Sequence, residues 1–408
     1  MMNRPAFVRS FTLTLILSFT LSSLWGTFAF AQLAPDAIDA ASVLPESMLS
    51  GSSYRVAREL PVKDHRFQFS IQTRYGTFTA SSILLLEKRL SELRAIEEAA
   101  RLGQGAVALE AAWKTLERTP RGAGHLLTDP LGTLAAAPSG FQRMASSVVN
   151  PVDRRSGSKA RRQLAANLGV DPETRNPVLG HLLDELATRQ IAGSAVTKFG
   201  LSAAVPGLGM LATMEDFRSQ IASMNPHEIL AEIDRELASL NVWKPARDEF
   251  VRNRRWTVLE KLAFMKFYRQ FADVQHADVM VYLTSRDATE ADVLRRLAEL
   301  RLMARLHRTS GIATINDGGL PVAVLRDGQI VGVCSVDYLM NTEPVQTAAS
   351  AFRKANPDRP LTLLSTGWLS PSAKKTLESN DITFQRVSFD VATAQPAASP
   401  QAPRSQRR

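Results

Sequence analysis

The sequence predicts an α+β fold with a small N-terminal antiparallel β unit, a helical middle and a C-terminal α/β unit with a hairpin and a βαβ crossover. Residues 53–82 alternate apolar and polar side chains, as half-buried strands do. Over most of 83–289, apolar residues recur at helical spacing. From 290 to 390, strand and helix patterns alternate along the chain. The chain has 408 residues, of which 45% are hydrophobic and 22% charged, and these values are typical of a globular protein.

The first residues, 1–31, have the layout of a secretory signal peptide. Arg4 and Arg9 precede an uncharged stretch, 11–31, which ends in Ala29-Phe30-Ala31 with small residues at the positions a signal peptidase requires. We therefore expect an exported protein, periplasmic or extracellular. The alternative is an inner-membrane anchor, because residues 11–31 are long enough to span a bilayer.

The next part of the chain predicts a linker followed by the β unit. Residues 32–52 are small and polar and contain proline and serine, which favours a linker. In 53–82, Phe67, Phe69 and Ile71 alternate with polar neighbours. We expect an antiparallel β unit there.

The helical middle, 83–289, contains sequence signals for the starts of helices. Asn176-Pro177 and Asn225-Pro226 each place a capping residue before proline at the first helical position. A long loop, 119–162, interrupts the helices. It ends in a basic run that is either a solvated helix start or a contact for anionic lipid or another polyanion; its cations are Arg154, Arg155, Lys159, Arg161 and Arg162.

The C-terminal unit, 290–390, is expected to open with a helix at 290–307, because Thr289 and Asp292 have the spacing of a capping box. A hairpin follows, and its Asp327-Gly328 pair favours a type I′ turn. The remaining predicted elements are a helix (343–354), a strand (361–365), a helix (371–378) and a strand (382–387). This order implies a right-handed parallel crossover. We expect the tail, 391–408, to be disordered because its composition is low in complexity.

Two segments match the dinucleotide-binding pattern G-x-G-x-x-A, at 103–108 and 207–212. A cofactor loop of this type follows a strand, whereas both segments follow helical patterns. We therefore predict no cofactor site. The second match lies in an apolar stretch, 199–214, which we interpret as a buried helix pair broken at Pro206; a membrane-inserting segment at 191–214 is the alternative.

Few side chains suggest chemistry. His181, Asp184 and Glu185 share one helix face, but a metal site needs at least one more ligand from elsewhere. Cys334 lies in an apolar run and is expected to be a buried, inert thiol. The segment 365–373 follows a strand and leads into a helix, so its hydroxyl groups either hold an anion or, at Ser370, cap the helix; these hydroxyls are Ser365, Thr366, Ser370 and Ser372. We predict no metal site, and no catalytic residue is identified.

Charge and export together restrict the partners. The net charge of +9 is modest for 408 residues, and an exported protein does not meet nucleic acid. An envelope protein or an anionic membrane surface is the expected partner.

The segments RYGTFTASSILLLEKRLSELRAI and NLGVDPETRNPVLGHLLDELA resemble an uncharacterised family of secreted proteobacterial proteins. No activity is known for that family, so the resemblance implies no site. We expect an exported, non-enzymatic protein that acts by interaction at the bacterial cell envelope. The alternatives are an exported hydrolase with dispersed catalytic residues and a membrane-inserting protein that uses residues 191–214.

Overall fold

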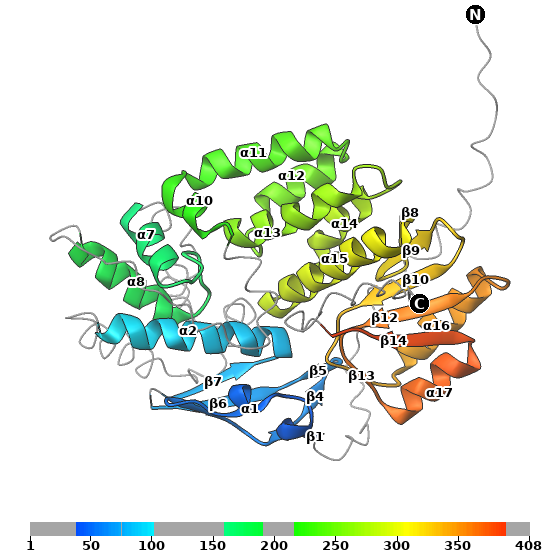
Figure 1. Ribbon diagram of the computed structural model, residues 1–408, viewed down its shortest axis with the longest axis horizontal. Coiled ribbons are helices and arrows are strands. Elements are labelled where there is room, and N and C mark those ends of the chain that lie inside the picture. Colours follow the sequence, from blue (N-terminus) through cyan, green and yellow to red (C-terminus); the bar gives the residue numbers. More distant parts are fainter. Residues whose placement is uncertain (1–37, 75, 102–158, 191–215, 389–408) are drawn as a thin grey trace, which may run out of the picture. The chain divides into compact units, whose positions relative to one another are not determined.

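The structure is a computed structural model that describes residues 38–74, 76–101, 159–190 and 216–388 (Figure 1). It confirms the α+β class, with an N-terminal antiparallel sheet, a helical middle and a C-terminal mixed sheet. One hydrophobic core runs from Ala40 through the helices to Leu364. The predicted units therefore share a core, and their boundaries mark changes of secondary structure within one compact unit.

The N-terminal β unit is an antiparallel sheet in the strand order β2-β6-β7, with β6 in the centre. Phe69, Ile71 and Phe78 are buried because alternate residues of its strands face the core. The short strands around it form two further pairs, β1-β3 and β4-β5. The strands are β1 (Ile38–Asp39), β2 (Tyr54–Val56), β3 (Glu59–Leu60), β4 (Val62–Lys63), β5 (Arg66–Phe67), β6 (Phe69–Thr73) and β7 (Gly76–Ala80).

The predicted linker, 32–52, is not a linker from residue 38 onward. Strand β1, a 3-10 helix η1 (Ala40–Ser42) and helix α1 (Glu46–Leu49) occupy this part. Ala40 and Met48 are buried in the main core. The prediction was wrong because the apolar residues of this segment have neither helical nor strand spacing in the sequence. They nevertheless pack into the core and hold the segment in place.

The helical middle contains the caps that the sequence predicts. Asn176 accepts hydrogen bonds from Val178 and Leu179 at the start of α8, and Asn225 forms a capping box at the start of α11. Confirmed caps of this kind fix where the helices begin. The elements are α2 (Ile83–Arg101), α7 (Lys159–Asn167), α8 (Pro177–Gln190), α10 (Arg218–Ser223), α11 (Pro226–Ser239), α12 (Lys244–Arg252), α13 (Val258–Tyr268), η2 (Arg269–Phe271), α14 (Asp278–Leu283) and η3 (Thr284–Arg286).

The C-terminal sheet has five strands in the order β14-β12-β10-β9-β8. Strands β10, β12 and β14 are parallel, as the crossover prediction requires, whereas β8, β9 and β10 form an antiparallel meander. The elements are α15 (Glu290–Ser310), β8 (Ile312–Asp317), β9 (Pro321–Leu325), β10 (Ile330–Cys334), β11 (Tyr338–Leu339), α16 (Glu343–Ala355), β12 (Leu361–Ser365), β13 (Trp368–Leu369), α17 (Pro371–Ser379) and β14 (Ile382–Arg386).

The two faces of this sheet belong to different cores. Val331, Val333 and Leu364 face the main core, which includes α15. Ile330, Leu361 and Ile382, which alternate with them, belong to a second cluster with residues of α16 and α17. The unit is therefore a three-layer sandwich with α15 on one face and α16 and α17 on the other (Figure 1).

The predicted β9-β10 hairpin is confirmed, but its turn is not type I′. That turn needs positive φ at both central residues, and only Gly328 in the loop has one, at 91°. The amide of Gly328 donates to the carbonyl of Leu325 at 3.0 Å. The two strands are therefore joined by four residues, of which Gly328 adopts a left-handed backbone conformation.

Several predicted segments lie outside the described residues. They are the signal peptide or anchor (1–31), most of the long loop (119–158), both G-x-G-x-x-A matches, the segment 191–214 and the tail (391–408). Among the helices that the structure describes, none combines the length and the apolar character that a membrane span requires.

Candidate functional site

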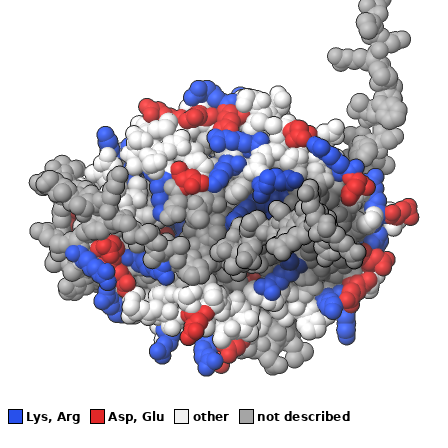
Figure 2. Space-filling view, viewed as in Figure 1, with Lys and Arg blue, Asp and Glu red and all other residues white. Residues whose placement is uncertain are grey.

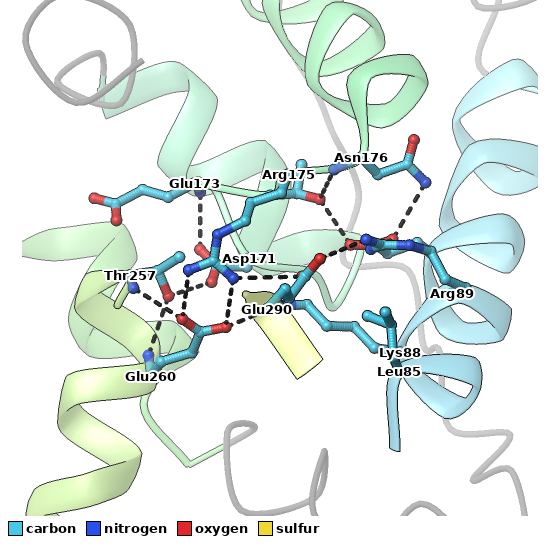
Figure 3. A network of polar contacts seen from close by, with 12 residues as sticks. Leu85, Lys88, Arg89, Asp171, Glu173, Arg175, Asn176, Thr257, Glu260 and Glu290 are labelled. Atoms are coloured by element: carbon cyan, nitrogen blue, oxygen red, sulfur yellow. Dashed lines mark hydrogen bonds and ion pairs between the residues drawn. The ribbon is translucent and has the colours of Figure 1, made fainter. Parts of the chain in front are cut away.

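A network of buried charges lies where three helices begin and α2 passes them (Figure 3). Helix α13 begins at a capping box formed by Thr257 and Glu260, and α15 begins with Glu290. These acidic side chains lie in first helical turns, where the helix dipole favours negative charge. Lys88 and Arg89 approach from α2.

Glu260 and Glu290 are the acidic centres of this network. Lys88 Nζ lies 3.0 Å from Glu260 Oε1 and 2.7 Å from Glu290 Oε1. Arg175, directly before the cap of α8, pairs with both carboxylates at 3.1 and 3.6 Å. These cations lower the pKa values of both carboxyl groups below their ordinary range against the effect of burial. Both carboxyl groups are therefore ionised, and both pair with Lys88 and Arg175.

Arg89 extends the network to Glu92 and α8. It pairs with Glu290 and, at 2.6 Å, with Glu92. The carboxylate of Glu92 also accepts hydrogen bonds from Thr174 at 2.7 Å and from the Asn176 amide at 3.2 Å. The residue that caps α8 is thus held by α2, which ties two helices far apart in the sequence.

A third part of the network holds acids whose pKa values are raised. Asp171 accepts from the Thr257 hydroxyl at 2.6 Å, and Glu173 accepts from the Val258 amide at 3.0 Å. Burial raises the pKa of Asp171, and burial with the Asp171 charge raises the pKa of Glu173 to about 7. Burial likewise lowers the pKa of Lys261 to about 8. Glu173 and Lys261 therefore have pKa values close to neutral pH.

The charged network is closed rather than open to a substrate. Lys88, Arg89, Glu260 and Glu290 are all buried, and their polar atoms face one another (Figure 3). A buried ion-pair network contributes little net stability, but removing one member leaves a charge without compensation. Its role is to fix α2 against α8, α13 and α15.

A second joint connects the β unit to the C-terminal unit through Asp337 and His65. The Asp337 carboxylate accepts from the amides of Phe67, at 3.0 Å, and Ile83, at 3.2 Å, the latter opening α2. Burial raises the pKa of Asp337 to about 7. In return, the His65 carbonyl accepts from the amides of Asp337 and Tyr338.

His65 itself is held in an unusual backbone conformation. Asp64 and His65 both have positive φ, 50° and 64°, in the two-residue turn between β4 and β5. Burial lowers the pKa of His65, and its neutral ring accepts from the Met340 amide at Nδ1. This histidine therefore has a structural role. In the sequence, this role is indicated by the adjacent Asp64 and His65, because both residue types tolerate positive φ.

The predicted face of His181, Asp184 and Glu185 lies on α8, but Asp184 is used by an arginine. Arg161 pairs with Asp184 and donates to the carbonyls of Pro172 and Gly180, each at 2.9 Å. His181 is half-buried and Glu185 is exposed. Nowhere in the described ranges do three His, Cys, Asp or Glu side chains gather as a metal site would require.

The basic run is not a solvated helix start at Arg161 and Arg162, which are buried in α7. Arg162 donates to the Ile221 carbonyl at 3.0 Å. Lys159 is exposed, while Arg154 and Arg155 lie outside the described residues. The two buried arginines bind backbone carbonyls of neighbouring segments, so they are not available to a lipid surface.

The hydroxyl groups of 365–373 form hydrogen bonds within the protein. Ser370 caps α17 by accepting from the Ala373 amide at 3.1 Å, as the capping interpretation expects. Ser365 accepts from the Gly367 amide, and Thr366 contacts the Ser335 hydroxyl at 3.0 Å. A Cβ on Gly367 would lie 2.0 Å from the carbonyl oxygen of Val336. The segment is packed against its neighbour.

A pocket lies in the second core, between the sheet and α16; we call it the C-terminal pocket. It has a volume of about 120 Å³ and is partly open to solvent. Its sheet side includes Leu320, Gly332 and Leu363. Its helix side includes Val345, Ala348, Ala349 and Phe352 from α16. Sequence reasoning missed it; the only trace is a glycine within an apolar strand.

Cys334 also lines the C-terminal pocket and is half-buried. Burial raises the pKa of this thiol to about 12, so it stays protonated. The sequence predicts a buried, inert thiol. Cys334 is only half-buried, while its raised pKa agrees with low reactivity, since nucleophilic attack requires the thiolate.

Surface charge shows no preference for one sign on the face seen in Figure 2, where basic and acidic side chains are interspersed. Elsewhere in the described residues, exposed charges form ion pairs, such as Arg269 with Glu236 and Arg286 with Asp317. This pattern gives no support for a broad basic surface on that face.

No protein-family model matches the chain, and neither a curated protein nor a solved structure matches it.

Proposed function

We propose that this chain is an exported, non-enzymatic binding protein of the bacterial cell envelope. The C-terminal pocket is the observation that carries the proposal. It is a preformed hollow whose side chains are apolar apart from one neutral thiol, and such a surface binds without providing groups for acid-base or nucleophilic catalysis. The N-terminal signal pattern supports export, and the partner is an envelope protein or lipid.

The chemistry of the remaining polar groups is consistent with this role. Ser370, His65 and the buried carboxylates each hold a helix start or a turn. The resemblance to secreted proteobacterial proteins points to the same compartment and remains a prediction.

Cell fractionation and affinity capture test the proposal together. The full chain, expressed with a C-terminal tag, is expected in the periplasmic or envelope fraction with a mature start near Gln32. Immobilised on a resin, it is expected to retain a specific lipid or protein from solubilised envelopes. Recovery only in the cytoplasm, or no specific retention, overturns the proposal.

Two variants on α16 connect retention with the pocket. Ala348 lines the C-terminal pocket, whereas Ala351 is exposed on the same helix and does not. Ala348→Trp is expected to lose the retained component, and Ala351→Trp to keep it. Equal retention by both variants would show that the pocket is not the binding site.

A further inference from the structure

The interior of the C-terminal pocket accepts only hydrocarbon. Leu320, Val345, Phe352 and Leu363 provide apolar walls, and Cys334 contributes an uncharged thiol. A polar or charged group placed among them would lose its hydrogen bonds to water without replacement, which is unfavourable. The part of a ligand that enters must therefore be apolar.

Small residues keep this space open from both sides. Gly332 lies in the middle of β10, where glycine weakens a strand. A Cβ there would come within 3.2 Å of Leu320 Cδ1 and 3.5 Å of Leu363 Cδ1. Opposite, α16 presents Ala348 and Ala349. Because the space lies between a sheet and a helix, we expect an extended chain to fit this slot better than a rounded group.

The volume sets the length of chain that fits. A cavity of roughly 150 Å³ holds one benzene molecule, and this pocket has about 120 Å³. By this comparison about five chain carbons, slightly fewer than the six of that ring, fill it. Gly318 and Ala348 on its lining are exposed to solvent, so a polar head group attached to the chain remains in water.

We propose that the C-terminal pocket binds the hydrocarbon end of a single-chain amphiphile and takes up about five carbons of it. The inference rests on the proposed binding role and names its ligand class. Contact between aliphatic walls and a saturated chain provides the affinity, while the head group contributes little because no charged side chain lines the pocket.

A series of straight-chain alcohols, from 1-propanol to 1-nonanol, tests the length of the slot. Affinity for the full chain, measured by isothermal titration calorimetry, is expected to rise about fourfold for each methylene that enters. It should level off near 1-pentanol, when the pocket is full. A steady rise to 1-nonanol, or no binding across the series, overturns the inference. Tighter binding of cyclohexanol than of 1-hexanol overturns the slot geometry.

Head-group variation separates the hydrocarbon contribution from charge. Octanoate and 1-octanol share their chain, so their affinities are expected to agree within about threefold, because no lining side chain is charged. A preference for octanoate above tenfold would contradict a purely hydrocarbon site.

Matched substitutions place the site. Ala348→Leu adds three carbons to the slot and is expected to weaken 1-hexanol binding by about tenfold or more. Ala351→Leu, on the same helix but off the lining, should leave it unchanged. With Gly332→Ala, the affinity should stop rising at an alcohol about one carbon shorter than in the wild type. Thermal midpoints report whether each variant folds.

The outcomes distinguish the inference from the proposed function. If alcohols do not bind while Ala348→Trp still abolishes retention of an envelope component, the ligand class is wrong and the binding role stands. If alcohols bind with the expected plateau but nothing is retained from envelopes, the pocket is correct and the proposed role falls.

Discussion

Glu290 shows how much depends on single buried charges. It contacts Lys88 and Arg89 and lies 3.6 Å from Arg175, so three cations rely on one carboxylate. Its pKa is far below the ordinary value because of those cations. The stability that this ionisation contributes is therefore present above the unfolded pKa and lost as the pH falls.

Glu290→Gln is expected to destabilise the fold by about 3–5 kcal/mol, because it leaves buried cations without their shared anion. Urea denaturation at neutral pH measures this loss. The matched control is Glu378→Gln, which removes an exposed pair with Lys374 at 3.8 Å and should cost less than about 1 kcal/mol. Similar losses in both variants would contradict a structural role for the network.

The contribution of Asp337 to stability depends on pH in the opposite direction to that of Glu290. Its folded pKa of about 7 exceeds the ordinary value of 3.8, so the fold favours the protonated acid. The stability it contributes is complete below the unfolded pKa and falls as the pH rises toward 7.

Comparing the wild type with Asp337→Asn from pH 5 to pH 8 isolates this group. The amide keeps an oxygen that accepts from Phe67 and Ile83. We expect the stability of the wild type relative to the variant to fall by up to about 1.4 kcal/mol per pH unit below 7, and to level off above it. A difference that is constant with pH, or that rises, contradicts the raised pKa.

At the scale of single elements, the sequence predicts helix starts well. Asn176, Asn225 and Thr289 each cap the helix that their spacing indicates. Capping is predictable because the cap and the amides it binds lie within a few residues of each other.

Ser370→Ala distinguishes the two functions that the sequence allows for this residue, helix capping and anion binding. Loss of the bond to the Ala373 amide is expected to cost about 1 kcal/mol, visible as a lower thermal midpoint at any phosphate concentration. Ser379→Ala, at the exposed end of the same helix, should be neutral. A Ser370→Ala effect that appears only with phosphate would favour the anion site.

Helix α2 shows where element-level prediction failed. Leu86, Leu90 and Leu93 are buried, as their spacing predicts. Lys88, Arg89 and Glu92 are buried too, although charged residues between apolar ones ordinarily face water. Arg89 and Glu92 pair within α2, but their other partners, and those of Lys88, lie in the segment before α8 and on α13 and α15, far away in the sequence. The local sequence of α2 therefore does not indicate that these charges are buried.

At the scale of the molecule, one core joins the β unit, the helices and one face of the C-terminal sheet. The buried network and the Asp337 joint cross the same boundaries. Folding of any one unit therefore depends on its neighbours.

We expect a single cooperative unfolding transition for the described part of the chain. Far-ultraviolet circular dichroism and tryptophan fluorescence should give the same urea midpoint, because Trp256 lies in the helical middle and Trp368 in the C-terminal unit, within or packed against the same core. Two separated midpoints would show that the units unfold independently.

By itself, the sequence determined the α+β class, the helix caps, the β9-β10 hairpin and the parallel crossover, because each follows from contacts or periodicities within one or two neighbouring elements. Only the tertiary structure decided that Ala40 and Met48 belong to the core, that Arg161 and Arg162 point inward, and that Lys88 meets Glu260. The C-terminal pocket is likewise tertiary, since Gly332 and Ala348 shape it from different layers. Burial and ion pairing across more than a hundred residues depend on packing, and packing leaves no local pattern in the sequence.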